Sequence, residues 1–197
     1  MMIFKVFDIK NLTDSQFEKA FEKMSEKRQE RCLRYKFIED RRRMAFGEEL
    51  LKGLISEVYK VSEAEITLEN LPSGKPVAYV SGKEIFVSIT HSGDFVAAAV
   101  SDTSVGIDLE IKKEFKSSVF KALSKEELEF VEKDRDKNHA FLRIWTAKEA
   151  YLKLTGEGLK GFSKADVLPL VKNGKWDGLV LKANHTDQYF LTVIYER

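Results

Sequence analysis

The stretch Val105-Gly106-Ile107-Asp108-Leu109-Glu110 alternates apolar and acidic residues after the glycine. A period of two is typical of a β-strand, so the side chains of Asp108 and Glu110 are expected on one face. Ile107 and Leu109 then point the other way, into a core. Two acids on a strand are most often its solvated face, so their function depends on what lies beside them.

A second stretch, Trp145-Thr-Ala-Lys-Glu-Ala-Tyr-Leu-Lys-Leu-Thr155, has the period of a helix and is followed by Gly156 and Gly158. Glu149 and Lys153 lie four residues apart on one face of this helix. One reading is an ordinary helix ion pair. If the strand lies beside the helix, however, three carboxylates and an ammonium converge, as a hard divalent cation and a polyphosphate require.

The composition is that of a globular protein without a strong charge bias. Of 197 residues, 43% are hydrophobic and 33% are charged, and the formal net charge is +1. This balance argues against a general nucleic-acid binder, which is usually strongly basic. The N-terminus is typical of a strand rather than a signal peptide, and no apolar run is long enough to span a bilayer. The single cysteine, Cys32, excludes an intrachain disulfide and predicts a cytoplasmic protein.

The order of predicted elements repeats once along the chain, although no residue-level repeat is visible. Residues 1–103 and residues 104–197 each contain a strand, then helices, then a set of antiparallel strands. We therefore expect an α+β fold of two pseudo-symmetric halves, each an antiparallel sheet packed with a long helix, with a ligand crevice between them. Helices are predicted at 13–24, 25–32, 39–59, 138–155 and from Ser124 onward, and strands at 1–7, 77–80, 86–90, 95–101, 105–111, 167–171, 179–183 and 189–195.

Cationic residues are concentrated between residues 23 and 43. This segment reads either as a solvated helix surface or as a phosphate clamp, because arginine offers forked donors that match phosphate oxygens. Its nine cationic side chains face only four acidic ones; they are Lys23, Lys27, Arg28, Arg31, Arg34, Lys36, Arg41, Arg42 and Arg43.

Two short motifs fit a nucleotide-like ligand. Pro72-Ser-Gly-Lys-Pro76 predicts a turn, whose Gly74-Lys75-Pro76 backbone could lie along a flat base. Ser88-Ile-Thr-His-Ser-Gly93 ends a strand with a histidine and hydroxyl groups where the chain turns. His91 is therefore the candidate phosphate contact. The other two histidines, His139 and His185, are expected to be structural.

Four blocks of the sequence together resemble the 4′-phosphopantetheinyl transferases, most closely the Sfp-like class. They are residues 74–76, 88–93, 105–110 and 145–153, and the resemblance extends over roughly residues 25 to 160. The resemblance implies transfer of the phosphopantetheine arm of coenzyme A to a serine of a carrier protein, with release of adenosine 3′,5′-bisphosphate. It also implies two pseudo-symmetric α+β halves that bind coenzyme A between them, in a monomer.

Roles for individual residues follow from this resemblance and from the chemistry of phosphoryl groups. Mg²⁺ would be held by Asp108, Glu110 and Glu149, and Lys153 would reach the same phosphates. Glu149, or a metal-bound water that it orients, would take the serine proton, and the sequence leaves both open. The implied coenzyme A contacts are Lys75 and Pro76 at the adenine, His91 and Arg31 at the 3′-phosphate, and Thr90, Arg28 and Arg43 as further contacts.

The carrier protein itself would be acidic, so a basic or apolar docking surface is expected. The residues after the metal strand, Lys112, Lys113, Phe115, Lys116, Val119, Phe120 and Lys121, form either that surface or an exposed linker. Two other functions stay open: a non-catalytic nucleotide-binding module with the same fold, and a different phosphotransferase or nucleotide hydrolase. The chain has no P-loop motif. Neither the type of carrier protein, nor Mn²⁺ in place of Mg²⁺, nor self-association follows from the sequence.

Overall fold

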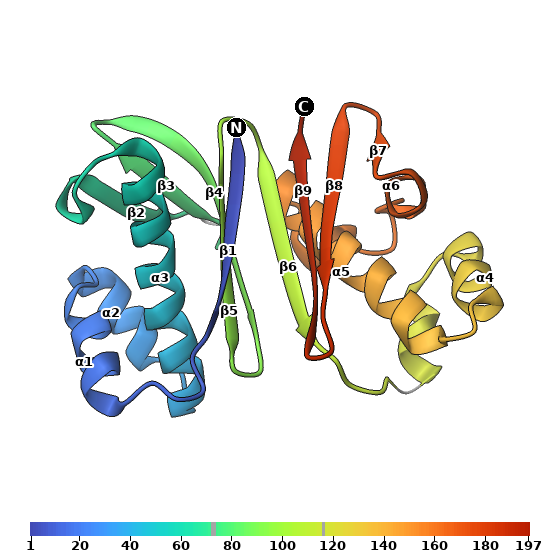
Figure 1. Ribbon diagram of the computed structural model, residues 1–197, viewed down its shortest axis with the longest axis horizontal. Helices are drawn as coiled ribbons and strands as arrows, with labels where there is room; N and C mark the ends of the chain where they lie inside the picture. The colour runs from blue at the N-terminus through green and yellow to red at the C-terminus, as the bar shows by residue number, and fades with distance from the viewer. Residues whose placement is uncertain (72–73, 116) are drawn as a thin grey trace.

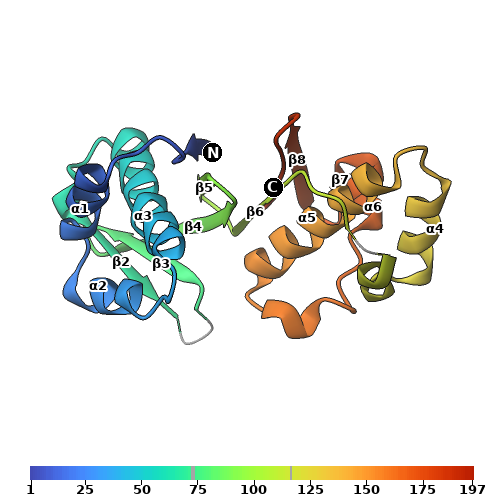
Figure 2. The ribbon, with the colours of Figure 1, turned by 90° about the horizontal axis from the view of Figure 1, so that it is seen from below.

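The computed structural model describes residues 1–71, 74–115 and 117–197. Two antiparallel sheets meet in the middle of the molecule, and the helices lie on the outer sides (Figure 1). Seen from below, the two long helices flank the central strands, one in each half of the chain (Figure 2). This arrangement confirms the predicted α+β fold of two halves, each with an antiparallel sheet and a long helix.

The first half forms a five-stranded sheet in the order β1-β5-β4-β3-β2. Its helix α3 packs on one face of this sheet, with Leu51, Leu54 and Ile55 buried against Ala98 and Val100. The elements in chain order are β1 (Met2–Asp8), α1 (Asp14–Glu22), α2 (Glu26–Leu33), α3 (Ile38–Tyr59), the 3₁₀ turn η1 (Glu63–Glu65), β2 (Ile66–Asn70), β3 (Pro76–Val80), β4 (Lys83–Ser92) and β5 (Phe95–Ser101).

The second half forms a four-stranded sheet in the order β6-β9-β8-β7, and α5 covers one of its faces. Strand β6 is therefore an edge strand of this sheet. The elements are β6 (Val105–Ile111), η2 (Ser117–Ala122), α4 (Lys125–Lys133), α5 (Lys137–Thr155), η3 (Gly158–Gly161), α6 (Leu168–Asn173), β7 (Lys175–Trp176), β8 (Leu179–His185) and β9 (Tyr189–Glu196).

Local signals in the sequence set several helix ends. Thr13 and Ser124 each accept a hydrogen bond from a backbone N–H three residues on and complete capping boxes at the starts of α1 and α4. At the other end of α5, Gly156 adopts a left-handed conformation with φ of 78°, which favours glycine. The helix therefore ends at Thr155, two residues after Lys153.

Three parts of the secondary-structure prediction differ from the structure. Residues 167–171 were predicted as a strand, and this prediction is wrong, because Leu168–Asn173 is the short helix α6. Pro169 in its first turn and Gly174 after its end are helix signals that the apolar run Val167 to Val171 masks. Strands β2 and β7 were not predicted. Pro72 and Ser73 of the predicted turn lie outside the described residues.

In the described part of the chain, no helix combines the length and the apolar character that crossing a membrane requires.

His185 provides a pH-dependent contribution to stability. Its ring lies 4.5 Å from the Phe190 ring, and its buried Nε2 has no hydrogen-bond partner in the described structure. Burial, followed by the charges of His139 and Arg143, lowers its pKa from 6.5 to about 4. The unfolded chain binds this proton at a higher pH than the folded chain does. This stabilisation is therefore complete above the unfolded pKa and is lost as the pH falls from 6.5 towards 4.

We predict that the melting temperature of the wild type falls between about pH 7 and pH 5, and that His185→Phe reduces this fall. The phenylalanine keeps the ring packing but cannot take up a proton. Thermal unfolding of both proteins at both pH values is the measurement. An equal fall in the two proteins would contradict the assignment to His185.

Candidate active site

Strands β4 and β6 belong to different sheets and meet along a row of hydroxyl groups, the hydroxyl seam. Alternate side chains of β4 point towards β6 and accept hydrogen bonds from every second backbone N–H of that edge strand. The pairs are Ile107 with Ser88 at 3.2 Å, Leu109 with Thr90 at 3.4 Å and Ile111 with Ser92 at 3.2 Å. The seam supplies acceptors to an edge strand whose N–H groups would otherwise lack partners.

Small residues let β6 approach its neighbours closely. On β5, Ala97 and Ala99 pack against Ile107 and Leu109 between the sheets. On the other face of β6, a Cβ at Gly106 would lie 1.9 Å from the backbone oxygen of Ala150 in α5. Only glycine fits there, so α5 lies directly over the face of β6 that carries the two acids.

The contact between β6 and α5 brings Lys153 to Asp108. The Lys153 ammonium lies 2.7 Å from Asp108 Oδ1 and donates to Thr90 Oγ1 at 3.0 Å. Thr90 Oγ1 also donates to Asp108 Oδ1 at 3.1 Å. The Asp108 carboxylate is 4% exposed, and its second oxygen, Oδ2, is buried without a hydrogen-bond partner in the described structure.

The two other acids of the predicted cluster lie nearby and are less buried. Glu110 accepts a hydrogen bond of 2.9 Å from Ser92 and pairs with Lys113 at 3.4 Å. Burial raises the pKa of the Glu149 carboxyl, and the negative charge of Asp108 raises it further, against the opposing effect of Lys153. The structure therefore brings together Asp108, Glu110, Glu149 and Lys153, with more negative than positive charge.

The side chains of this cluster have the right chemistry for a divalent cation, but they are not arranged as a complete coordination site. Three carboxylates are the hard oxygen donors that Mg²⁺ prefers, and the unpartnered Asp108 Oδ2 is an atom that a cation would satisfy. Among the described residues, however, no group of three or more His, Cys, Asp and Glu side chains is already arranged to hold a metal ion. Lys153 and Ser92 instead hold one oxygen each of Asp108 and Glu110.

A cavity of about 270 Å³ lies between the two halves, and Lys75, Pro76, Glu149 and Lys153 all line it. Lys75 crosses it, donating to the backbone oxygen of Leu154 at the end of α5 at 2.7 Å. The remaining lining residues are Gly74, Ser88, Ile89, Leu152, Gly156 and Gly158. Two predicted adenine contacts and two predicted catalytic residues thus share one cavity.

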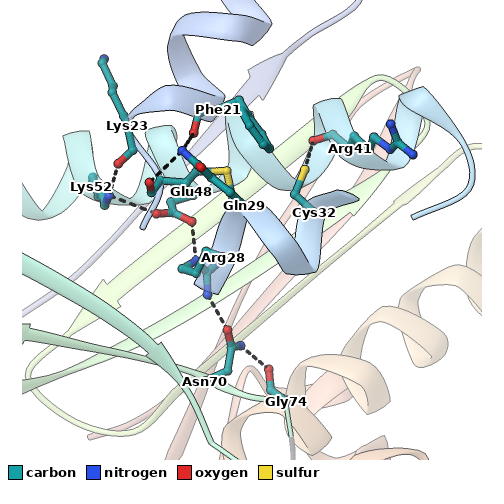
Figure 3. Close-up of polar contacts among 11 residues, drawn as sticks. Phe21, Lys23, Arg28, Gln29, Cys32, Arg41, Glu48, Lys52, Asn70 and Gly74 are labelled. Carbon is teal, nitrogen blue, oxygen red and sulfur yellow. Dashed lines mark hydrogen bonds and ion pairs between the residues drawn. The ribbon is translucent and has the colours of Figure 1, made fainter. Parts of the chain in front are cut away.

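Arg28 belongs to a buried network rather than to an open phosphate clamp (Figure 3). Its guanidinium donates to Glu48 and to Asn70 Oδ1, and both Arg28 and Glu48 are buried. Asn70 Nδ2 donates to the backbone oxygen of Gly74 at 2.8 Å. Arg28 therefore supports the turn that leads into Lys75. It also lines the same cavity as Arg31, and its contact with coenzyme A stays a prediction.

The other predicted coenzyme A contacts fall into separate places. Arg31 lines a cavity of about 490 Å³ between α2, α3 and β2. Arg43 donates to the backbone oxygen of Gly93 at 3.0 Å and pairs with Asp40 at 2.7 Å. His91 is exposed at the end of β4, yet desolvation by the surrounding protein lowers its pKa, and the charges of Arg43 and Lys153 lower it further. Thr90 is 4% exposed and engaged in the hydroxyl seam.

Sequence reasoning missed the structural roles of five residues around the site. The spacing of Ser88, Thr90 and Ser92, one hydroxyl at every second position of a strand, was a signal for a hydroxyl-lined face. Glu48 and Asn70 had no such signal. Their partners, Arg28 and Gly74, are brought to them only by the fold.

Comparison with known proteins matches both halves of the chain. The family described as "4′-phosphopantetheinyl transferase superfamily" matches residues 104–193, and the one described as "4′-phosphopantetheinyl transferase, N-terminal" matches residues 11–103.

Individual relatives carry the same description. The chain is 35% identical to 4′-phosphopantetheinyl transferase psf-1 of Bacillus pumilus, over 64% of this chain and 55% of that protein. It is 28% identical to 4′-phosphopantetheinyl transferase Sfp of Bacillus subtilis (strain 168), over 81% of this chain and 72% of the relative. A third relative is 4′-phosphopantetheinyl transferase HetI of Nostoc sp. (strain PCC 7120 / SAG 25.82 / UTEX 2576). The chain is 29% identical to it, over 78% of this chain and 68% of HetI. The matches thus span from about half to almost three quarters of these relatives.

The close contact at Gly106 leads to a test of how the site is assembled. We predict that Gly106→Ala lowers the free energy of unfolding by about 3 kcal/mol, at the upper end of what overpacking costs, because the new Cβ must push α5 away from β6. Denaturant unfolding measures this.

The matched control is Gly53→Ala in α3, where a Cβ would meet no atom within 4 Å. This change should stabilise by about 0.5–1 kcal/mol, as alanine does in a helix interior. A Gly106→Ala protein as stable as the wild type would show that α5 does not depend on this contact.

Proposed function

The chain belongs to the 4′-phosphopantetheinyl transferase superfamily, with relatives of the Sfp type, and we propose that it transfers the 4′-phosphopantetheine arm of coenzyme A to a serine of an apo carrier protein. The observation that carries this proposal is the cavity between the halves. It joins the turn at Lys75 and Pro76 to the helix face bearing Glu149 and Lys153. An elongated nucleotide with a reactive pyrophosphate needs a site with those two ends.

The two halves take different parts in this proposal. Residues 1–103 bind the adenine and the 3′-phosphate of coenzyme A, and residues 104–197 hold the charged cluster that acts on the pyrophosphate. The two family matches meet between residues 103 and 104, which supports a boundary at that position.

Asp108, Glu110 and Glu149 are the residues that would hold Mg²⁺, which when bound neutralises the charge of the pyrophosphate. Lys153, already within reach of the Asp108 carboxylate, provides a positive charge for the same phosphate oxygens. Glu149 takes the proton of the attacking serine hydroxyl, either directly or through a water molecule that it orients. A bond then forms between the serine oxygen and phosphorus, while the phosphorus–oxygen bond to adenosine 3′,5′-bisphosphate breaks.

The contacts to coenzyme A are proposed from position and charge. Lys75 and Pro76 line the adenine site, and Arg31, Arg43 and His91 are the candidates for the 3′-phosphate. Arg28 and Thr90 support the coenzyme A site indirectly, by holding neighbouring groups in place, because their polar groups already bind Glu48, Asn70 and Asp108. A cytoplasmic location is consistent with the single cysteine, Cys32, which is buried. We further propose a monomer with an internal pseudo-two-fold axis.

Asp108→Asn tests the charged cluster, because it keeps the size of the side chain and removes its charge. The wild type, incubated with coenzyme A, Mg²⁺ and an apo carrier protein, should add the mass of the phosphopantetheine arm to the carrier. We expect the variant to lose this transfer by about 100-fold or more, since a cation ligand is worth several kcal/mol in the transition state. The measurement is intact-mass spectrometry of the carrier over time.

Asp102→Ala is the matched control, because Asp102 is an exposed acid in the turn between β5 and β6 that pairs with the N-terminal amine and not with the charged cluster. This variant should keep full activity. Transfer at the wild-type rate by Asp108→Asn would refute the role of the cluster. A wild type that binds coenzyme A but modifies no carrier would favour the non-catalytic binding module.

Arg31→Ala tests the phosphate contact. Loss of one charged hydrogen bond costs about 1.5–3 kcal/mol, so the KM for coenzyme A should rise by about 10-fold or more, with a small change in kcat. Lys83→Ala, at the exposed start of β4, should leave the KM unchanged. If the KM of the Arg31 variant stays at the wild-type value, Arg31 does not bind the 3′-phosphate.

A further inference from the structure

The connection between α2 and α3 exposes an unusual amount of apolar side chain. Four of the ten exposed large hydrophobic residues in the described chain fall within six consecutive positions. We call this segment, residues 33–38, the apolar connection. Its exposed members are Leu33 at 54%, Tyr35 at 36%, Phe37 at 58% and Ile38 at 47%. Apolar residues gathered in this way indicate an interaction site, whereas single exposed ones need no explanation.

The apolar connection is fixed in place rather than loosely attached. Arg41 of α3 reaches back and donates to the backbone oxygens of Tyr35 at 2.9 Å and Leu33 at 3.2 Å. The Tyr35 N–H donates to Cys32 at 3.1 Å. These bonds hold the backbone while its side chains face solvent, and a partner would therefore lose little conformational freedom here on binding.

The residues of the apolar connection are poor choices for local stability. Phe37 is the N-cap of α3 and provides no side-chain hydrogen bond to the helix. A serine or aspartate in its place would stabilise the helix by about 1 kcal/mol. An exposed phenylalanine at an N-cap is better explained by a contact outside the chain than by folding.

The charged residues within the apolar connection are both positive, and the acids Glu39 and Asp40 follow it in the first turn of α3. Arg34 and Lys36 lie within the apolar connection, and neither takes part in the ion pairs found among the described residues. Lys36 lies over the Phe37 ring at 5.4 Å. An apolar centre with cationic neighbours favours a partner with an apolar face and acidic edges.

The apolar connection also leads into the candidate active site. Five residues after Ile38, Arg43 donates to the backbone oxygen of Gly93 in the turn that follows His91 and Ser92. Ser92 in turn binds Glu110 of the charged cluster. A partner seated here would therefore lie at the side of the cleft where the strand β4 ends.

The surface predicted from the sequence is less suitable. Phe115, Val119 and Phe120 are half-buried and pack against the core around α5, so only part of each side chain is left for a partner. Lys116 lies outside the described residues. Lys112, Lys113 and Lys121 are exposed, but Lys113 is already engaged, since its ammonium pairs with Glu110 and lies 5.1 Å from the centre of the Phe115 ring.

We propose that the apolar connection docks the carrier protein, with Phe37 and Ile38 against an apolar face of the carrier and Arg34 and Lys36 against its acidic edges. This inference rests on the proposed transferase function and adds to it the place where the protein substrate binds. Docking beside the end of β4 presents the carrier serine to the cleft between the halves.

The test is the double variant Phe37→Ser/Ile38→Ser, with Trp176→Ser as the matched control. Trp176 is 44% exposed on β7, in the other half of the chain. At saturating coenzyme A, we expect the KM for the carrier to rise by about 10-fold or more in the double variant, as for loss of an interface hot spot. The kcat and the KM for coenzyme A should stay close to wild type, and the melting temperature should not fall, because serine is a good N-cap at position 37. Trp176→Ser should change none of these.

A charge variant tests separately whether Arg34 and Lys36 bind the acidic edges of the carrier. Arg34→Glu/Lys36→Glu should raise the KM for the carrier most at low salt and reverse its dependence on salt, because salt then screens a repulsion instead of an attraction. Lys172→Glu/Lys175→Glu, two charge reversals in the other half, is the control and should keep the wild-type salt dependence.

Calorimetric titration with a carrier whose serine is replaced by alanine separates docking from transfer. Binding by the wild type that the double variant loses supports docking, even if no transfer occurs and the transferase proposal fails. An unchanged carrier KM and affinity in the double variant overturn the docking proposal. A rise in the KM for coenzyme A alone also overturns it, because the surface would then bind the nucleotide. A wild type that is dimeric while the double variant is monomeric overturns it as well, because the surface would then bind a second copy of the chain. A wild type that neither binds nor modifies the carrier overturns both proposals.

Discussion

The contact between the hydroxyl groups of β4 and the backbone of β6 is the constraint on which the site depends. β6 is an edge strand, and its inner N–H groups need acceptors that its own sheet does not supply. Ser88, Thr90 and Ser92 supply them from the face of the other sheet. The same contacts fix the register between the sheets, so that Thr90 and Ser92 also meet the carboxylates of Asp108 and Glu110.

The charged cluster is costly for stability and is held by its surroundings. Asp108 is almost fully buried, and one of its oxygens has no partner in the described structure, which is unfavourable unless a cation compensates. Lys153 compensates in part, and burial, followed by the negative charges of Asp108 and Glu110, raises the pKa of Glu149. Gly106 makes this arrangement possible, because it lets α5 approach the strand that carries the acids. The packing energy of the two cores supports a cluster that would not form alone.

Periodic patterns carried most of what the sequence could predict. The alternation at 105–111 and the helix period at 138–155 each gave an element close to its observed bounds, because both segments are long or strongly patterned. The apolar run at 167–171 has neither property, so only Pro169 and Gly174 distinguish its helix from a strand. β2 was missed because Ile66-Thr-Leu-Glu-Asn70 is short, and its strand state depends on pairing with β3.

Arg28 and Arg31 show why the roles of individual site residues could not be predicted from the sequence and required the structure. They lie one turn apart on the same short helix and are chemically identical, and the sequence assigns both to one cluster of positive charge. Both arginines line the same cavity, but the fold binds the Arg28 guanidinium to the buried Glu48 and the half-buried Asn70. An arginine whose donors are already satisfied inside the protein gains little from a phosphate, because the ligand would have to displace Glu48 from a site with little access to water. The difference arises from α3 and β2, which come from other parts of the chain, so charge composition can locate a basic surface but cannot decide which of its members binds a ligand.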